Sequence, residues 1–267
     1  MTGTIAAGLA LALLACGVSL LTFFAGFGLG TLLMPAFALF LPIEVAVAST
    51  AIVHGSNNIF KVAMLARQAR RSVVIAFGIP AMLAAFVGAY LLNTLAGEAS
   101  LATWNAYGRV AVVTPVKLVL GLLIVAFGLF ELVPRLRTLR APAKFLPLGG
   151  VVAGFFGGLS GHQGALRAAF LSPLGMPPTE FAATQAVLGL MVDAARLVIY
   201  AATFLVVGRT AAGVPIPWPL VIAATAGALI GAWLGRSMLP KMTIHRVQVL
   251  TGVLLLVVGL ALASGLI

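Results

Sequence analysis

Long apolar stretches with very few charges constrain this chain more than any other feature of its sequence. Hydrophobic residues make up 62% of it and charged residues 8%, and its mean hydropathy is +1.19. A soluble domain carries roughly 25% charged residues. This chain has too little polar surface to cover itself in water, so we predict a multi-pass membrane protein in a lipid bilayer.

The apolar runs predict the segments of the fold. A run of roughly 20 residues crosses a hydrocarbon core about 30 Å thick, and 30–41, 145–159 and 164–175 are too short for this. Because a chain in lipid must satisfy its own backbone hydrogen bonds, we expect helices and an all-α fold. The runs cover 5–25, 30–41, 44–65, 72–95, 109–133, 145–159, 164–175, 179–208, 216–239 and 245–265.

Similar segments in the two parts of the chain predict an internal duplication. The paired segments, in chain order, are 23–30 with 155–164, 41–49 with 176–184, 87–91 with 230–234 and 121–132 with 252–263. Their shared order indicates two copies of one unit. We therefore expect a first membrane repeat at 1–133, a basic cytoplasmic linker at 134–144 and a second membrane repeat at 145–267.

The positions of the basic residues indicate that the two copies have opposite orientations. In the first copy, "RQARR" (67–71) and "RLRTLRAPAK" (135–144) carry the positive charge, whereas the second copy carries it in "GRSMLPKMTIHR" (235–246). Cytoplasmic loops are enriched in Lys and Arg, so the bias has changed sides. The net charge of +11 does not indicate nucleic-acid binding, because these residues lie in short connections.

Inverted repeats require an odd number of membrane crossings in each copy. This follows if 145–175, and 5–41 before it, each form a re-entrant hairpin that is followed by three transmembrane helices. The chain then has about eight hydrophobic helices. The alternative is eight plain spans in parallel copies, with 5–25 crossing the membrane.

Two glycine-rich segments occupy equivalent places at the tips of the proposed hairpins. They are "GFGLG" (26–30) and "GGLSGHQG" (157–164). Glycine breaks a helix and frees backbone N–H groups, which lipid cannot satisfy. Half-helices that start near Thr31 and Ala165 would direct these donors at an anion, as in many secondary transporters. Close helix packing is the alternative explanation, which stays open for "GFGLG" and which we apply to Gly78, Gly88, Gly121, Gly227, Gly231 and Gly252.

Ionisable residues at membrane depth point to the same region. "HGSNNIFK" (54–61) places His54, Asn57, Asn58 and Lys61 along one stripe of a helix. In the second copy, Asp193 corresponds to Asn57, and Arg196 is close enough to pair with Asp193. Arg167 follows the second tip and is the best candidate for an anion clamp. The alternatives are snorkelling for Lys61 and Arg196 and a hydrogen-bonded core histidine for His54.

Metal binding and catalysis are not expected. The three histidines, His54, His162 and His245, do not have the spacing of metal ligands, and the single cysteine forms no cage. No serine or cysteine nucleophile stands in the local context that such motifs need. We therefore expect no cofactor, no metal and no enzyme activity, and an accessory membrane subunit stays as an alternative to a transporter.

The chain resembles the TauE/SafE family of sulfite and organosulfur exporters, within the 4-toluene sulfonate uptake permease-like superfamily. "GFGLGTLLMPAF" and "GGLSGHQGALRAAF", each opening one half, and "AVAST" (46–50) carry the resemblance. It implies a bacterial inner-membrane carrier of small sulfur-containing anions such as sulfite, sulfoacetate or thiosulfate. Family members commonly have a glycine near His162 or Gln163, so the second tip is more polar here than is usual.

These observations define a candidate anion site for a secondary transporter, with sulfite as the favoured substrate. We expect alternating access by rocking of one repeat against the other, and protons as the coupling ion through His54 or Asp193. The expected substrate-binding residues are Gly28, Gly30, Thr31, Asn57, Asn58, Lys61, Ser160, Gly161, His162, Gln163, Gly164, Arg167, Thr184, Gln185 and Arg196.

Overall fold

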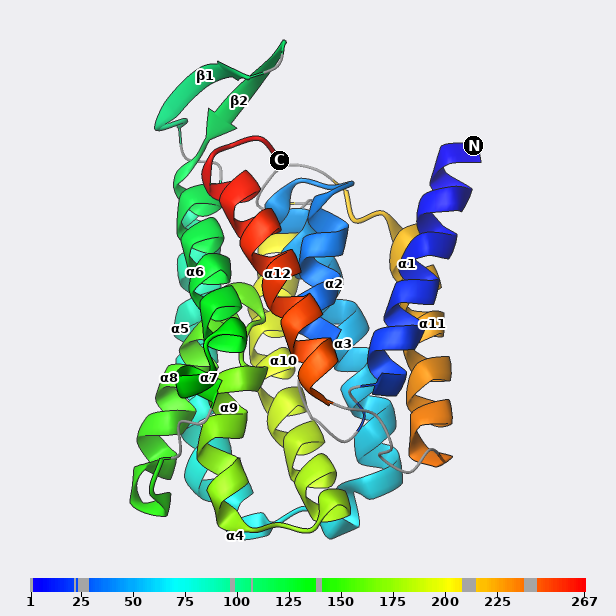
Figure 1. The fold of residues 1–267 in the computed structure, drawn as a ribbon, viewed down its shortest axis with the longest axis vertical. Coiled ribbons are helices and arrows are strands. Elements are labelled where there is room, and N and C mark those ends of the chain that lie inside the picture. The colour runs from blue at the N-terminus through cyan, green and yellow to red at the C-terminus, as the bar shows by residue number, and fades with distance from the viewer. Residues whose placement is uncertain are drawn as a thin grey trace.

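The protein is a bundle of helices in the computed structural model (Figure 1). The structure describes residues 2–21, 23, 29–96, 99–106, 108–137, 141–207, 215–237 and 244–267. Five described helical segments are long and apolar enough to cross a membrane, so the predicted all-α polytopic membrane fold is confirmed. These segments are Arg71–Leu95, Pro115–Leu132, Ala143–Ser160, Pro178–Thr203 and Trp218–Arg236.

Helices of the first half begin with a pair that returns to its own end of the molecule. In Figure 1, α1 runs from the N-terminus to the middle, α2 runs back, and α3, α5 and α6 then cross the bundle in alternating directions. The bounds are α1 (Thr2–Leu21), α2 (Leu29–Ala38), α3 (Ile43–Leu65), α4 (Arg71–Val73), α5 (Ile79–Leu95), α6 (Pro115–Leu132) and α7 (Pro134–Arg137).

The second half begins with a similar pair at the opposite end. In Figure 1, α8 rises to the middle and α9 returns, α10 then runs up through the bundle and α11 runs down, and α12 runs up to the hairpin end from about the height at which α1 ends. The bounds are α8 (Leu146–Ser160), α9 (Gly164–Leu171), α10 (Pro178–Val207), α11 (Trp218–Ser237) and α12 (Ile244–Ala263). A 3-10 turn at Ala143–Phe145 lengthens this segment to Ala143–Ser160, which by length and composition alone could cross a membrane, although α8 ends in the middle of the bundle in Figure 1.

The closest helix contacts join the two halves. α1 packs on α11, α5 on α8 and α6 on α12, and glycines allow their backbones to touch. A Cβ atom on Gly154 of α8 would lie 2.0 Å from the Ala81 carbonyl oxygen of α5, and one on Gly231 would lie 2.1 Å from that of Cys16. The packing explanation is confirmed for Gly88, Gly121, Gly227 and Gly231, which meet backbone atoms of another helix. It is also confirmed for Gly252, which meets the Leu132 side chain, and for Gly78, which meets Met191 and Leu188.

A β hairpin at one end of the bundle was not expected from the sequence. The run 109–133 is helical only from Pro115, because Thr114 caps α6 there by accepting a hydrogen bond from the Lys117 N–H at 3.3 Å. The β-branched residues before it form β2 (Arg109–Val113), which pairs antiparallel with β1 (Ala102–Ala106). The hairpin docks on the C-terminal turn, where the Trp104 indole N–H donates to the Ser264 carbonyl at 2.8 Å.

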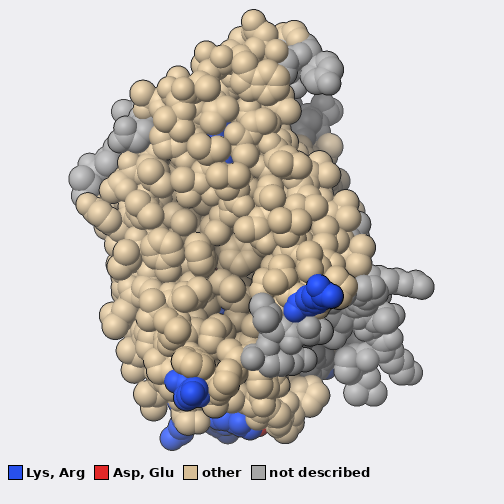
Figure 2. Space-filling view, turned by 60° about the vertical axis from the view of Figure 1, so that its left-hand side comes forward, with Lys and Arg blue, Asp and Glu red and all other residues tan. Residues whose placement is uncertain are grey.

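Described basic side chains gather at the end of the molecule opposite the hairpin (Figure 2). We call this the basic end and the other the hairpin end. The basic end includes the turn between α3 and α5, with Arg67, Arg70 and Arg71, and the last turn of α11, with Arg236. The positive-inside rule predicts that the basic end is cytoplasmic.

Candidate functional site

Glycines from the two halves touch in the middle of the bundle. Gly161 ends α8 in the left-handed conformation, with φ of +83°, and its N–H donates to the Gly157 carbonyl at 2.8 Å. A Cβ atom on Gly30, in the first turn of α2, would lie 3.3 Å from the Gly161 carbonyl oxygen. Gly28, the other predicted glycine of the first tip, lies outside the described residues.

The second tip is a polar turn buried in an apolar bundle. The Ser160 hydroxyl donates to the Phe156 carbonyl at 3.0 Å, and the His162 ring stacks on Phe127 with 5.5 Å between centroids. Gly164 begins α9 directly after Gln163. His162 Nε2 and Gln163 Nε2 are buried and have no hydrogen-bond partner among the described residues.

Asp193 joins α3 to α10 at the level of these turns. Its Oδ2 atom accepts hydrogen bonds from His54 Nδ1 at 2.6 Å and from Asn58 Nδ2 at 2.8 Å. Its Oδ1 atom accepts from Arg196 Nε at 3.1 Å and Nη2 at 2.8 Å. The predicted Asp193–Arg196 pair is therefore present, and the snorkelling explanation is wrong for Arg196, whose guanidinium is fully buried.

The remaining nitrogen of Arg196 is directed at the Gly161 turn. A Cβ atom on Gly161 would lie 2.7 Å from Arg196 Nη1. This nitrogen is buried and finds no acceptor in the part of the chain that the structure describes. The site thus contains a fixed cationic donor beside a residue that has no side chain.

A second cationic region lies on the other side of Asn58. A Cβ atom on Gly189 would lie 2.6 Å from Asn58 Nδ2 and 3.3 Å from Arg167 Nη1, so these groups surround Gly189. Arg167 Nη1 donates to Gln163 Oε1 at 3.3 Å. The Lys61 ammonium lies 5.2 Å from the Phe23 ring centroid and close enough to Arg167 for their charges to repel. Lys61 is only 7% exposed, so snorkelling is wrong for it too.

Other predicted residues have different surroundings. The Ser19 hydroxyl donates to Asn57 Oδ1 at 3.1 Å, which ties α1 to α3. Thr31, by contrast, is buried in α2 beside the second tip, where its backbone lies near the His162 ring. Thr184 lies apart from the tips, because its hydroxyl accepts a hydrogen bond from the Arg70 N–H at 2.9 Å and donates to the Glu180 carbonyl at 2.7 Å. The described contacts bring together Gly30, His54, Asn58, Lys61, Ser160, Gly161, His162, Gln163, Gly164, Gly189, Arg167, Asp193 and Arg196.

Several functional candidates were missed by the sequence reasoning. Ser49 and Thr50 are fully buried on α3, and their hydroxyls find no partner among the described residues. Thr50 lies one helical turn before His54, so the same stripe would have included it. The Tyr200 hydroxyl donates to the Gly158 carbonyl at 3.1 Å, three residues before the Gly161 turn. Arg70 was assigned only to the basic loop.

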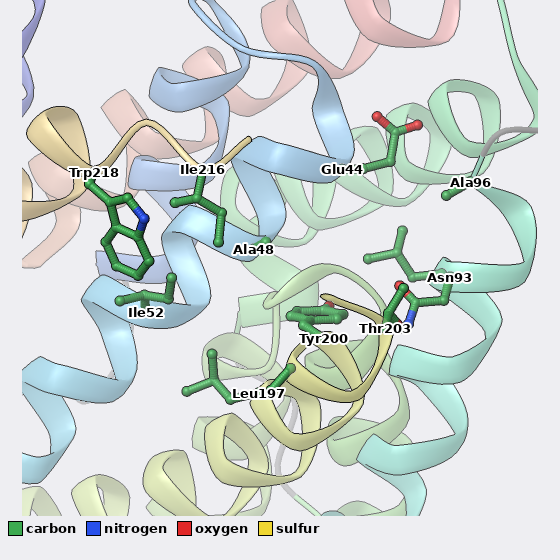
Figure 3. Close-up of a pocket in the computed structure, with 12 residues that line it drawn as sticks. Glu44, Ala48, Ile52, Asn93, Ala96, Leu197, Tyr200, Thr203, Ile216 and Trp218 are labelled. Atoms are coloured by element: carbon green, nitrogen blue, oxygen red, sulfur yellow. Dashed lines mark hydrogen bonds between the residues drawn. The ribbon is translucent and has the colours of Figure 1, made fainter. Parts of the chain in front are cut away.

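A cavity of about 280 Å³ lies between α3, α5, α10 and the start of α11, toward the hairpin end. Figure 3 shows Ile52, Leu197, Tyr200 and Trp218 around it, with Glu44 at its rim. Leu197 and Tyr200 are respectively the next residue and the next turn after Arg196 on α10. The cavity therefore borders the buried polar cluster, and its walls are mainly apolar.

Comparison with known proteins identifies a family for this chain. The family model described as Sulfite exporter TauE/SafE matches residues 11–262. Neither a curated protein nor a solved structure matches the chain. The match spans both glycine-rich segments, 26–30 and 157–164, and agrees with the resemblance that they carry in the sequence.

Proposed function

The chain belongs to the sulfite exporter TauE/SafE family, and from that membership we propose that it is a secondary transporter of a small sulfur-containing anion across the bacterial inner membrane. Sulfite is the favoured substrate, and sulfoacetate and thiosulfate are the other candidates. The protein supplies no reaction chemistry in this proposal. It binds the anion, shields it from lipid and exposes it to each side of the membrane in turn.

The observation that carries the proposal is Arg196 Nη1 beside Gly161. A buried cationic donor without an acceptor is costly, and the cost is removed when an anionic oxygen occupies the position next to it. Asp193 holds the other two nitrogens of the fork, so the guanidinium is already oriented before an anion arrives. Charge-assisted hydrogen bonds of this kind are the strong ones for oxyanions.

Further donors lie within the same buried region. Gln163 Nε2 is an available donor at the second tip, directly after His162 in the chain, and Arg167 and Lys61 add positive charge nearby. We propose that these groups hold the anion together with the main chain of both tips. The complete proposed set is Gly28, Gly30, Thr31, Asn57, Asn58, Lys61, Ser160, Gly161, His162, Gln163, Gly164, Arg167, Gln185 and Arg196, with Thr184 at the entrance rather than at the tips.

We retain the inverted repeats, 1–133 and 145–267, as part of the proposal. The α1–α2 and α8–α9 pairs approach the middle from opposite ends, and exchanging the halves turns the α1–α11 contact into the α8–α5 contact. Rocking of one entire repeat against the other would separate α1 from α11, α5 from α8 and α6 from α12. We therefore propose that two groups of helices move against each other during alternating access, and that both members of each of these three pairs belong to the same group.

His54 and Asp193 are the proposed proton-coupling pair. The two side chains are 2.6 Å apart and belong to helices of different halves. A change in their protonation would alter the contact between α3 and α10, which a coupling site requires. Neutralising substitutions test this role, because His54→Gln is expected to leave anion binding in place and to remove the dependence of transport on a proton gradient.

A thermal-shift panel tests the proposed function directly. Purified protein is heated with sulfite, thiosulfate, sulfoacetate, sulfate or phosphate, and an anion that binds the folded state raises its melting temperature by mass action. We expect sulfite to give the largest shift and Arg196→Gln to abolish it. Arg236→Gln, which removes an exposed arginine at the end of α11, is the matched control and should keep the shift. If none of the five anions stabilises the parent protein, the substrate class is wrong and an accessory subunit is favoured.

A further inference from the structure

Arg70 connects the turn after α3 to the start of α10 at the basic end. Its Nε and Nη2 atoms donate to the two carboxylate oxygens of Glu180 at 2.6 and 3.1 Å. Its Nη1 atom donates to the Leu174 carbonyl at 3.1 Å, and its backbone N–H donates to the Thr184 hydroxyl at 2.9 Å. Arg70 thus fastens the connection between α3 and α5 to the connection between α9 and α10 and to the first turns of α10. We propose that Arg70, Glu180 and Thr184 form the gate at the basic end of the anion path.

A buried polar side chain lies directly behind this gate. Gln185 follows Thr184 on α10 and is 1% exposed, and neither its amide nitrogen nor its amide oxygen has a partner in the described residues. One turn further along the same helix, Gly189 faces Asn58 and Arg167. An amide buried without partners is costly unless water or a ligand reaches it in another state of the protein. Gln185 therefore marks a route between the gate and the cationic part of the site.

The equivalent positions of the first half have a different structure. Aligning the glutamates of the paired segments 41–49 and 176–184 places Glu44 opposite Glu180, and the same offset of 136 residues places Ala48 opposite Thr184. Glu44 and Ala48 line the cavity of about 280 Å³ toward the hairpin end, whereas Glu180 and Thr184 are held by Arg70. The same two positions thus border a cavity at one end and a closed contact at the other. In alternating access, the open end must close and the closed end must open, so that each end takes the structure now seen at the other.

The chemistry of the gate suits repeated opening. The Arg70 and Glu180 side chains are 33% and 25% exposed, so water is available to both when they separate. Ion pairs in such surroundings stabilise a protein only weakly. The two parallel hydrogen bonds between Arg70 and Glu180 still fix one relative position of the two segments in the closed state. A reversible closure needs both properties, and a fully buried pair would open at much greater cost.

Thiol labelling of a reporter behind the gate tests the inference, which rests on the proposed function but needs no anion. Gln185→Cys is introduced with Cys16→Ser, and a membrane-impermeant methanethiosulfonate is applied to inside-out and right-side-out vesicles. Loss of the ion pair should raise the open population, so Arg70→Gln and Glu180→Gln should each label about tenfold faster in inside-out vesicles. The exchange Arg70→Glu with Glu180→Arg should return labelling to the slow rate.

Arg71→Gln is the matched control, because it removes the same charge from the next residue, which is exposed. Unchanged labelling in both neutral variants, equal acceleration by Arg71→Gln, or acceleration only in right-side-out vesicles would overturn the gate. The exchange variant separates loss of the gate from loss of the fold, since misfolded protein would not recover slow labelling. A failed anion panel with labelling as expected would overturn the proposed substrate and leave the gate in place.

Discussion

Two groups of glycines in this protein differ in what a methyl group would meet. At the packing glycines, which are Gly88, Gly154, Gly158, Gly227 and Gly231, an added Cβ atom would lie 2.0 to 2.1 Å from a backbone oxygen of another helix. At the turn glycines, Gly30 and Gly161, the nearest atoms are a carbonyl oxygen at 3.3 Å and the Arg196 guanidinium at 2.7 Å.

This difference separates two reasons for placing glycine in a membrane helix. The packing glycines bring backbones together and fix helices of different halves in pairs, where lipid offers no hydrophobic drive for association. The turn glycines leave space beside buried donors. A methyl group at a packing glycine is therefore expected to disturb the fold, whereas a methyl group at a turn glycine is expected to disturb the site.

The largest effect is expected for Gly154→Ala. Its methyl group would lie 2.0 Å from the Ala81 carbonyl oxygen and 2.5 Å from the Ala81 Cα atom, so α8 and α5 would have to separate. Overpacking of this kind costs about 1–3 kcal/mol or more, a large part of a stability of about 5–15 kcal/mol. We expect little monodisperse protein in size-exclusion chromatography. A normal elution profile and melting temperature would show that the two helices are not held by this contact.

Gly161→Ala is expected to lose anion binding and to keep most of the folded protein. Alanine in the left-handed conformation costs about 1–2 kcal/mol, and its methyl group would occupy the position beside Arg196 Nη1. The measurement is the anion-induced thermal shift, which should disappear.

Gly175→Ala is the matched control for this prediction. Gly175 also has a positive φ, of +61°, but no atom of the described residues lies within 4 Å of its added Cβ. Both variants carry the strain of a positive φ, so both melting temperatures should fall, and that of Gly161→Ala should fall further because of its contact with Arg196. Loss of the anion shift in both would attribute the effect to strain rather than to the space beside Arg196.

Arg196→Lys tests what the space beside Gly161 is for. Lysine keeps the positive charge but lacks the planar fork that binds Asp193 and an anion at once. Loss of one charge-assisted hydrogen bond, about 1.5–3 kcal/mol, should weaken anion binding at least roughly tenfold in a titrated thermal shift. Arg236→Lys is the control on α11. Equal affinity of Arg196→Lys and the parent would mean that the anion is held elsewhere.

Much of the fold and part of the site followed from local sequence patterns. The helix break at Gly161 was visible because glycines and polar residues interrupt an apolar run, and the Asp193–Arg196 pair was visible because its members are three residues apart. The His54–Asp193 contact was not predicted, because its partners are 139 residues apart and only tertiary packing joins them. For the same reason Arg70 was assigned only to membrane topology, and its hydrogen bond to Thr184 was not predicted.

Gly30→Ala is expected to have a small effect that falls between the two groups. Its methyl group would lie 3.3 Å from the Gly161 carbonyl oxygen, so the tips must move apart by a few tenths of an ångström. Alanine also favours the helix by about 0.5–1 kcal/mol relative to glycine, which offsets that strain in the melting temperature. We expect unchanged stability and an anion affinity lowered a few-fold in the titration. A loss of folded protein would place Gly30 with the packing glycines.

Gly17→Ala should have the smallest effect, and it sets the limit of the comparison. Gly17 lies on the exposed side of α1, and no atom of the described residues lies within 4 Å of its added Cβ. Helix propensity is then the only contribution to the change in stability, and alanine favours a helix more than glycine does. The melting temperature should therefore stay the same or rise slightly, and the anion-induced thermal shift should be kept. If Gly17→Ala instead destabilises the protein as much as Gly154→Ala does while cross-linking joins two copies at α1, a second copy of the chain packs against α1 in the membrane. Small residues on a lipid-facing helix are how membrane helices approach a partner, so that result would turn this face of α1 into a subunit interface and move Gly17 into the packing group.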